Sequence, residues 1–285
     1  MDSKQASIVN AEPYEVYAIR YGHNMNKARD NFLFDPQHLP FTPHHESHSD
    51  IHDQMALDYY IWAIIGNGHT VIVDLGFEHQ GAKRRGRKII QLPSSALSML
   101  DIDASSVEDV IVTHLHYDHA GDLASFPNAR LHVQESELAY ATGPYMAHRS
   151  LRLAFDVDYV VAFVRAIYDD RVHFVHGDDE IYPGISVHHI GGHTLGHQAV
   201  RVWTNAGWLV LASDAVHLYA NIEMQNPFPI VHNVGDVITG YTKLNKLASS
   251  PKLVIPGHDP LVVNRFPCPD EKFLGDIVKL SDGPH

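Results

Sequence analysis

Short runs of apolar residues, separated by turn-forming glycine, proline, asparagine and aspartate, recur along most of the chain. Runs that are rich in valine, isoleucine and aromatic residues predict β-strands. The predicted strands are 14–21, 57–65, 70–74, 110–112, 130–133, 172–175, 185–190, 199–204, 208–212 and 252–255. The Gly-Asn-Gly-His turn at 66–69 joins two of them and predicts a hairpin.

Segments with helical spacing lie between many of these strands. The longest, 145–171, repeats apolar residues at intervals of about 3.6 and predicts a helical insertion. Other predicted helices are 92–100, 120–124, 135–141 and 233–248. The basic run 83–88 is predicted to be the solvated face of a helix. The mixture of strands and helices indicates an α/β protein. A second sheet is predicted from strands 172–175, 185–190, 199–204 and 208–212.

Residues 31–53 differ in composition from the rest of the chain, with aromatic and proline residues followed by a histidine-rich stretch. A long irregular segment inside a compact domain is usually functional or mobile. One interpretation is a lid loop at 31–56 whose Phe32 and Phe34 contact a substrate. The alternatives are an ordered surface loop with solvated histidines and an additional metal-binding tract.

Composition and charge narrow the class of protein. The 285 residues are 45% hydrophobic, which suits one globular domain spanning 1–285. A formal charge of −13 opposes binding to nucleic acids or anionic membranes, because their phosphate groups would be repelled. No segment reaches the roughly 18 uninterrupted apolar residues of a membrane span, and the N-terminus lacks the pattern of a secretory signal. The single Cys268 excludes an internal disulfide framework, and we expect a cytoplasmic protein.

The densest group of reactive side chains follows the apolar run 110–112. His114 and His116 are two residues apart, so in an extended chain they project to the same side and can bind one cation. Asp118 and His119 follow after a turn and could not reach that cation without strain, which predicts a second one. Imidazole and carboxylate suit zinc and related first-row ions. The alternative is a surface histidine cluster in a chain that holds 23 histidines.

Three later motifs also follow apolar runs: Gly-Gly-His-Thr-Leu-Gly-His at 191–197, Ser-Asp-Ala at 213–215 and Pro-Gly-His-Asp at 256–259. Together with His-x-His-x-Asp-His at 114–119, they resemble the signature of the metallo-β-lactamase fold superfamily. Within it the chain is most similar to quorum-quenching N-acyl homoserine lactonases and to pyridoxolactonase-like lactone hydrolases. The resemblance implies an αββα sandwich of two mixed β-sheets with helices on both outer faces.

The resemblance also implies a set of metal ligands and of residues behind them. Two divalent metal ions are implied, with zinc first and iron, manganese or cobalt as alternatives. One ion would bind three histidines and the other an aspartate and two histidines, with a second aspartate bridging them. The ligands of the first ion would be His114, His116 and His193. Those of the second ion would be Asp118, His119 and His258, and the bridging aspartate would be Asp214. Asp74 would orient a ligand histidine from behind, with a simple turn aspartate as the alternative. His197 would either have a structural role or lie behind the ligands.

The implied function is a metal-dependent hydrolase that opens the ring of an N-acyl homoserine lactone or a related small lactone. A hydroxide held between the two ions would attack the carbonyl, and Asp118 would carry a proton to the departing ring oxygen. The homoserine lactonases place a tyrosine three residues after the bridging aspartate, where this chain has His217. Either His217 or Tyr219 would therefore hold the substrate carbonyl. From the helical insertion, Tyr145 and Met146 are predicted to contact the substrate, unless they simply pack on the sheet.

Other functions are compatible with the same ligands. A glyoxalase II-like thioesterase, a β-lactamase-like enzyme and a hydrolase of another ester or cyclic amide would share the implied site. A metal-binding or sensing protein is the alternative outside enzymes, and alanine at Asp118 or Asp214 would leave its function intact. The expected partner is a small-molecule lactone, with no nucleic acid and no membrane. The sequence leaves open whether the chain is a monomer or a homodimer.

Overall fold

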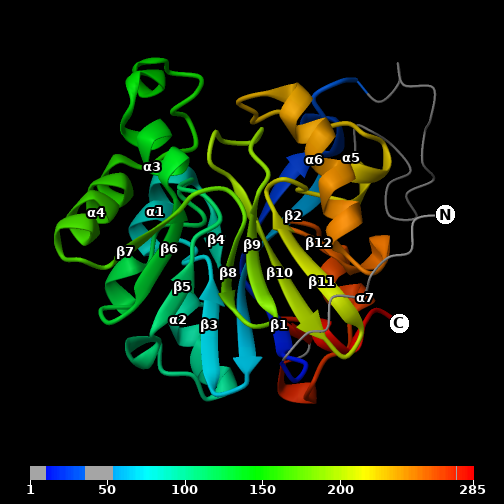
Figure 1. Cartoon of the computed structure of the whole chain (residues 1–285). Helices are drawn as coiled ribbons and strands as arrows, with labels where there is room; N and C mark the ends of the chain where they lie inside the picture. The colour runs from blue at the N-terminus through cyan, green and yellow to red at the C-terminus, as the bar shows by residue number, and fades with distance from the viewer. Residues whose placement is uncertain (1–10, 36–53, 274) are drawn as a thin grey trace.

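The structure is a computed structural model that describes residues 11–35, 54–273 and 275–285. In these residues two β-sheets lie face to face, and helices cover the outer side of each (Figure 1). The sequence resemblance implied this αββα sandwich, which is confirmed. Among the described helices, none has the length and apolar content needed to cross a membrane.

In the described chain the larger sheet has eight strands, with β4 beside β1 and the others in the order β13-β1-β2-β3-β5-β6-β7. These strands are β1 (Glu15–Lys27), β2 (Gln54–Gly66), β3 (His69–Val73), β4 (Lys88–Ile89), β5 (Asp109–Ile111), β6 (Arg130–Gln134), β7 (Val172–Val175) and β13 (Ile277–Lys279). The run from β3 through β5 and β6 to β7 is parallel, whereas β1 pairs antiparallel with β2, β4 and β13. β2 and β3 form the predicted hairpin, in which Gly66 pairs with His69.

The smaller sheet has the order β12-β11-β10-β9-β8. Its strands are β8 (Asp179–Tyr182), β9 (Ile185–His189), β10 (Gln198–Thr204), β11 (Gly207–Ser213) and β12 (Val254–Pro256). β11 and β12 run parallel, and the other neighbours run antiparallel. The prediction that 172–175 belongs to this sheet is wrong, because these residues form β7, which pairs in parallel with β6. Apolar content predicts a strand but does not determine which sheet the strand joins.

Several short elements differ from the sequence prediction, and the strands β4, β8 and β13 are absent from it. β8 is a strand that the sequence does not predict, because it lies at a sheet edge and begins with two exposed acidic residues. Its position depends on backbone pairing with β9 rather than on buried side chains. The helix predicted at 120–124 does not form, and a 3-10 turn covers Leu123–Ser125 instead.

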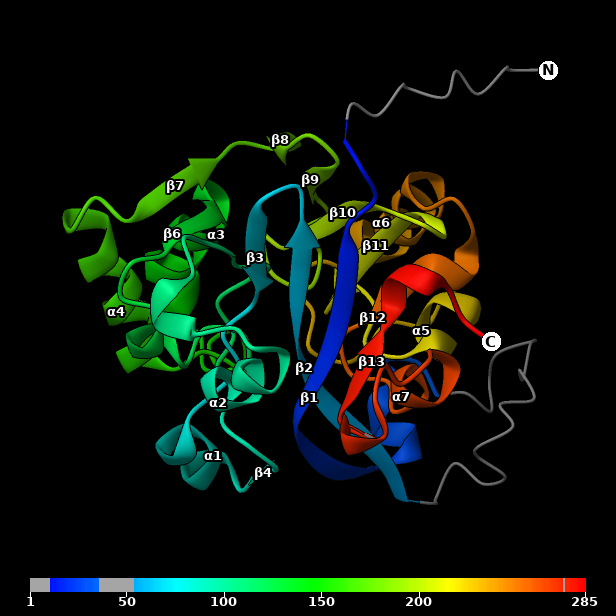
Figure 2. The ribbon, with the colours of Figure 1, turned by 90° about the horizontal axis from the view of Figure 1, so that it is seen from below.

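The helices divide between the two sides of the sandwich (Figures 1 and 2). On the side of the larger sheet lie α1 (His79–Arg85), α2 (Pro93–Leu97), α3 (Glu135–Thr142) and α4 (Val157–Tyr168). On the side of the smaller sheet lie α5 (Tyr219–Glu223), α6 (Val234–Leu247) and α7 (Leu261–Arg265). Further 3-10 helices occupy Ala28–Asn31, Ser98–Leu100, Ala104–Ser106, Pro144–Ala147, Pro251–Leu253, Glu271–Phe273 and Leu280–Asp282.

The helical insertion predicted at 145–171 is shorter in the structure. A 3-10 turn at Pro144–Ala147 is followed by turns, and the helix α4 begins only at Val157. The Asp156 side chain accepts a hydrogen bond from the Asp158 backbone N–H, and this N-cap defines the start of α4. The apolar spacing therefore identifies the helix, whereas the cap determines its first residue.

The first half of β1 and most of β2 are buried on both faces. Tyr17, Ile19 and Tyr21 of β1 pack in the core beneath α1 to α4. Val16 and Ala18 point the other way and pack in the core between the two sheets. Because successive side chains of a strand alternate between faces, a strand covered on both sides has no polar face. This double burial explains the nearly continuous apolar runs at 16–21 in β1 and 59–65 in β2.

Candidate metal centre

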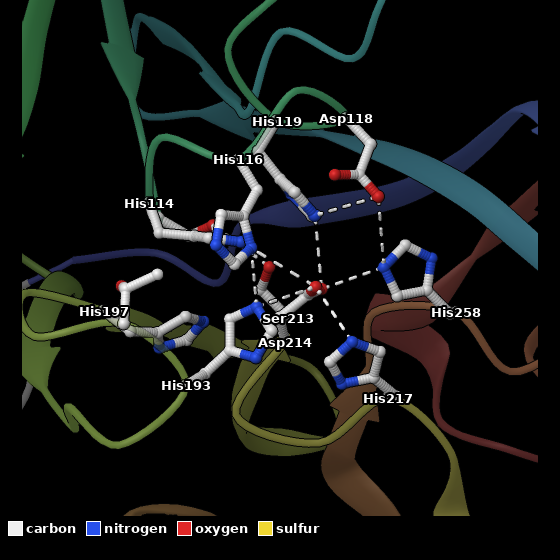
Figure 3. Close-up of polar contacts among 12 residues, drawn as sticks. His114, His116, Asp118, His119, His193, His197, Ser213, Asp214, His217 and His258 are labelled. Carbon is white, nitrogen blue, oxygen red and sulfur yellow. Dashed lines mark hydrogen bonds and ion pairs between the residues drawn. The ribbon is translucent and has the colours of Figure 1, made fainter. Parts of the chain in front are cut away.

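The four sequence motifs come together at one edge of the sandwich. The stretch from His114 to His119 follows β5, and His193 lies in the loop after β9. Asp214 follows β11 directly, and His258 lies just after β12. Figure 3 shows these side chains pointing toward one another from four loops. Loops at strand ends commonly carry functional groups, because the sheet holds the base of each loop in place.

The side chains form two ligand groups that share Asp214. The first group is His114, His116, His193 and Asp214, and the second is Asp118, His119, Asp214 and His258. Within each group the ligand atoms lie within 4.8 Å of one another, and every member is buried. The structure thus brings together all of the residues that the sequence predicted as metal ligands.

Asp214 lies between the two groups (Figure 3). Its Oδ1 lies 3.2 Å from His119 Nε2 and 3.0 Å from His258 Nε2. Its Oδ2 lies 3.3 Å from His193 Nε2 and 3.7 Å from His114 Nε2. A carboxylate in this position can bind one cation through each of its oxygens.

Several ligand atoms are buried and lie close to one another but form no hydrogen bond. These atoms are His114 Nε2, His119 Nε2 and Asp214 Oδ1. An unpaired buried polar atom costs about 1–3 kcal/mol, so such a cluster is stable only if something else completes it. Divalent cations would do so, and nitrogen and oxygen ligands of this kind fit zinc, iron, manganese or cobalt.

The charges within the centre also suit a cation. Burial lowers the pKa of His114, His116 and His193 well below the usual histidine value, so these imidazoles are neutral at pH 7. Burial opposes ionisation of Asp214, but the neighbouring imidazoles, His217 first, outweigh it and hold the pKa of this carboxyl well below its usual range. These three histidines therefore present neutral nitrogen lone pairs beside an anionic carboxylate, which is what metal binding requires. At His119 and His258 burial is outweighed by the Asp214 carboxylate, which raises their pKa, so a cation would have to displace protons there.

Asp74, directly after β3, holds the first ligand loop from behind. Its Oδ2 accepts a hydrogen bond from His119 Nδ1–H at 2.7 Å. The Thr113 backbone N–H and hydroxyl donate to the two Asp74 oxygens at 2.7 and 2.8 Å. The contact with His119 orients its ring so that Nε2 faces the centre. Asp74 thus lies where the sequence analysis expected it, behind the ligands.

Two further histidines are fixed by backbone groups. His258 Nδ1–H donates to the Asp58 carbonyl at 2.8 Å, which directs Nε2 into the centre. His197 is fully buried, and its Nε2 accepts a hydrogen bond from the Ala215 backbone N–H at 3.2 Å. Burial lowers the pKa of His197 to about 3, so this ring is neutral. His197 lies outside both ligand groups and contacts the loop that carries Asp214.

Glu137 is a buried residue at the start of α3 that the sequence analysis missed. Its carboxylate accepts hydrogen bonds from Leu115 N–H at 2.9 Å and Gly196 N–H at 3.0 Å, and from the Thr194 hydroxyl at 2.6 Å. Burial raises the pKa of Glu137, although these hydrogen bonds oppose the shift. Glu137 therefore joins the loop that follows β5 to the loop that follows β9. No motif spacing indicates this role, because two of its three partners are backbone groups.

A cavity of about 460 Å³ opens onto the centre. Asp118, Asp214 and His217 are among the polar residues that line it. Leu57 and Phe228 contribute apolar surface to the same cavity. A small molecule bound here would contact both ligand groups.

The structure distinguishes between His217 and Tyr219, the two residues predicted to take the place of the lactonase tyrosine. His217 lines the cavity, and its Nε2 lies 3.1 Å from Asp214 Oδ2. The His217 ring stacks on Phe228 at a centroid distance of 3.9 Å. Tyr219, the first residue of α5, instead lines a different cavity. Its ring centroid lies 3.9 Å from the Arg265 guanidinium carbon. Of the two predicted residues, His217 is therefore the one that faces the centre.

None of the four residues predicted to contact the substrate lines this cavity in the part of the chain that the structure describes. Phe32 packs in a small apolar cluster, and Phe34 is exposed. Tyr145 packs against neighbouring aromatic rings, and Met146 packs against the core beneath the helices. The predicted lid residues 36–53 lie outside the described residues.

The basic run 83–88 divides into two kinds of side chain. Its two lysines are exposed, as the sequence predicts: Lys83 and Lys88. Its three arginines line the cavity: Arg84, Arg85 and Arg87. The prediction of a solvated face holds for Arg84, which is exposed. It is wrong for Arg85 and Arg87, which are half-buried and contact Tyr117.

Residues 56–258 match the family model of the metallo-beta-lactamase superfamily. The N-acyl homoserine lactonase AttM of Azorhizobium caulinodans is 32% identical over 166 residues, which are 56% of this chain and 61% of that protein. The N-acyl homoserine lactonase AttM of Rhizobium radiobacter is 30% identical over 169 residues, which are 58% of this chain and 62% of that protein. Both matches span less than two thirds of the relative's own length.

Solved structures share the fold at lower identity. A quorum-quenching N-acyl homoserine lactone lactonase has a TM-score of 0.67 at 21% identity, covering 87% of this chain and 92% of the other. AidC, a dizinc quorum-quenching lactonase, has a TM-score of 0.66 at 15% identity, covering 88% of this chain and 90% of the other. The family model spans most of the chain, from 56 to 258, and its fold is the one observed. The chain therefore belongs to the metallo-beta-lactamase superfamily.

Proposed function

We propose that this protein is a hydrolase with two divalent metal ions that opens a lactone ring, either an N-acyl homoserine lactone or a related small lactone. The observation that carries the proposal is Asp214, which belongs to two separate ligand groups beside one cavity. The curated relatives, which are named N-acyl homoserine lactonases, support the substrate class.

Zinc is our first choice for both ions. When bound, the two cations would polarise the ester carbonyl and supply a nucleophilic water near neutral pH. Each cation would have three side chains of its own and share Asp214 with the other. Iron, manganese and cobalt are alternatives, because both groups consist of nitrogen and oxygen ligands.

We assign proton transfer to Asp118. This residue lines the cavity, and its Oδ2 lies 3.7 Å from His258 Nε2 and 3.9 Å from His119 Nε2. The buried Tyr21 hydroxyl donates to the Asp118 backbone carbonyl at 2.8 Å and holds the loop at this point. A carboxylate within reach of the departing ring oxygen can deliver the proton that ring opening requires.

We assign the holding of the substrate carbonyl to His217. Its ring is held between the stacked Phe228 ring and the Asp214 carboxylate, with Nε2 toward the centre. When cations occupy the Asp214 oxygens, the Nε2–H of His217 is available to donate to a carbonyl oxygen. A tyrosine hydroxyl at the same position would donate a hydrogen bond of the same kind.

A pH-stat assay of the zinc-loaded protein tests this function. The panel contains short- and long-chain N-acyl homoserine lactones, γ-butyrolactone and an aromatic-fused lactone. We expect acid release that disappears when zinc is removed and falls about 100-fold or more in Asp118→Asn, because general acid catalysis contributes at least that much. Asp101→Asn is the matched control, since Asp101 is exposed and lies outside both ligand groups.

If no lactone of the panel releases acid although two zinc ions per chain are verified, the lactonase proposal is contradicted. Thioesters, β-lactams and other cyclic amides would then be assayed on the same protein. Full activity of Asp118→Asn on any hydrolysed lactone would contradict the role of Asp118 alone.

A further inference from the structure

One wall of the cavity is basic, in a chain whose formal charge is −13. Its side chains are Arg84, Arg85 and Arg87, which we call the arginine wall. Arg85 lies over the Tyr117 ring, with its guanidinium carbon 4.2 Å from the ring centroid. Arg87 Nε donates to the Tyr117 hydroxyl at 3.1 Å. Tyr117 therefore joins two of the arginines to the ligand loop.

Arg84 is exposed, and its charge is paired with two carboxylates. Its Nε and Nη2 donate to Asp156 Oδ2 at 3.0 and 2.8 Å. Its Nη2 also lies 3.9 Å from Glu78 Oε1. Since these carboxylates compensate its charge, Arg84 supports the wall and is not free to bind an anion.

Arg85 and Arg87 form no ion pair with a carboxylate among the described residues, although Asp118 lies near enough for its charge to act on Arg87. Arg85 donates to the backbone carbonyls of Leu153 at 2.7 Å and Phe155 at 2.8 Å, which fix its position without neutralising it. Arg87 is half-buried, and its Nη1 and Nη2 groups have no acceptor among the described residues. Two guanidinium charges without a described carboxylate partner thus line the cavity that adjoins the ligand groups.

We propose that the arginine wall binds a carboxylate on the substrate, so that the substrate is a small lactone acid. This inference rests on the proposed function for the reaction at the metal centre. With Nε bound to Tyr117, Arg87 offers its Nη1–Nη2 edge, and a guanidinium edge matches the two oxygens of a carboxylate. The nearby charge of Arg85 adds attraction that a neutral substituent would not feel.

The carboxylate would lie close to the ring that opens. Tyr117, at the base of the wall, and Asp118, beside the reacting ester, are consecutive residues that both line the cavity. Arg87 lines the same cavity of about 460 Å³, so the acid and the ring of one small molecule can reach the wall and Asp118 together. Leu57, Phe228 and Ile230 provide apolar surface for the rest of the molecule.

A structural role for Arg87 makes a different prediction. The Tyr117 hydroxyl also contacts the Tyr59 hydroxyl at 3.1 Å, so Arg87 could act only by ordering this pair. Removing Arg87 would then reduce activity equally for acidic and neutral substrates. Removing a carboxylate-binding group would reduce activity selectively for the acidic one.

The test uses two γ-butyrolactones that carry either a carboxylate or a carboxamide at the same ring carbon. On the zinc-loaded wild type, we expect the higher kcat/KM for the carboxylate. Arg87→Gln should lose about 10- to 100-fold on the carboxylate and little on the carboxamide, because one charge-assisted hydrogen-bonded pair is removed. Arg87→Lys keeps the charge without the planar fork and should lose less. Lys83→Gln is the matched control, since Lys83 belongs to the same run but is exposed and outside the cavity.

A binding measurement separates this inference from the proposed reaction. Tetrahydrofuran-2-carboxylate and tetrahydrofuran-2-carboxamide, which have no ester to hydrolyse, are titrated calorimetrically into the same zinc-loaded proteins. A preference for the carboxylate that is lost in Arg87→Gln supports the inference, even if neither lactone is hydrolysed and the proposed reaction fails. Three results would overturn it: no preference in the wild type, equal losses on both ligands in Arg87→Gln, or a preference that survives in Arg87→Gln because the metal ions alone bind the acid.

Discussion

Asp74 contacts both His119 and Thr113 with its carboxylate while its own backbone lies in the left-handed region, at φ 64°. A carboxylate behind a ligating imidazole fixes the tautomer and raises the basicity of the ring. Asparagine tolerates the left-handed conformation about as well as aspartate. Asp74→Asn therefore changes the charge behind His119 and leaves the backbone conformation accessible.

For Asp74→Asn we expect zinc affinity to fall about 10- to 100-fold, the usual effect of removing a partner behind a ligand. Equilibrium dialysis against zinc with a competing chelator measures this affinity. Asp101→Asn is the matched control, because Asp101 is exposed and also left-handed, at φ 58°. Unchanged zinc affinity in Asp74→Asn would show that His119 does not depend on this carboxylate.

At the residue scale, the meeting of the candidate ligands is predictable because short motifs contain them. Arg87 is not, since its partner Tyr117 lies 30 residues away and the contact exists only in the folded chain. Glu137 is not predictable either, because two of its partners are backbone N–H groups on separate loops. Whether His217 or Tyr219 faces the metal centre depends on the direction of α5, which begins at Tyr219. No local sequence pattern predicts that direction.

Two loops of the metal centre meet at α3, and a glycine allows their close approach. Gly196 N–H donates to the Glu137 carboxylate at 3.0 Å. A Cβ built at Gly196 would lie 2.6 Å from Glu137 Cβ and closer still to the Glu137 backbone, nearer than real Cβ atoms come. The position therefore requires glycine because α3 packs directly against it.

We expect Gly196→Ala to lower the free energy of unfolding by about 1–3 kcal/mol, the usual cost of overpacking a buried contact. The loop that carries His193 must also shift, so zinc content after dialysis should fall. Urea unfolding and metal analysis measure the two effects. Gly235→Ala is the control, because its new Cβ would meet only Asn233 Oδ1 at an ordinary 3.4 Å. Equal stability and zinc content in both variants would contradict this packing argument.

At the element scale, the predictable strands are those with long apolar runs, such as 59–65 of β2, which is buried on both faces. The assignment of 172–175 to the wrong sheet and the absence of a prediction for β8 have a common cause. Pairing partners of edge strands depend on backbone hydrogen bonds between distant segments, and side-chain patterns do not record them. The start of α4 is a similar case, because it depends on the Asp156 cap rather than on apolar spacing.

The two sheets of the whole molecule are also tied together at the other end of β5, away from the ligand loop. Asp109, at the start of β5 in the larger sheet, accepts a hydrogen bond from the Tyr182 hydroxyl of β8 in the smaller sheet at 2.6 Å. His132 Nε2–H, from β6, donates to the other Asp109 oxygen at 2.7 Å. Burial raises the pKa of Asp109, but the hydrogen bonds from His132 and Tyr182 outweigh it and leave the pKa below its usual value.

This shift predicts a pH-dependent contribution to stability. A carboxyl whose folded pKa lies below its unfolded value stabilises the fold above the unfolded pKa, near 4, and loses that contribution as the pH falls through the folded pKa. At pH 7 we expect Asp109→Asn to be less stable than the wild type by about 1–3 kcal/mol. Urea unfolding from pH 7 toward pH 3 should show this difference shrinking. Tyr182→Phe, which removes one donor, should show a smaller difference with the same trend. A difference that is constant or grows toward low pH would contradict this account of Asp109.

The most direct test of the dinuclear centre is a zinc titration of the metal-free protein in which the rate of lactone hydrolysis is followed. We expect the rate to rise until about two zinc ions are bound per chain and then to stay constant, because Asp214 belongs to both ligand groups and the reaction needs both ions. A rate that reaches its maximum at one zinc ion per chain, or that does not depend on zinc, would contradict a dinuclear hydrolase.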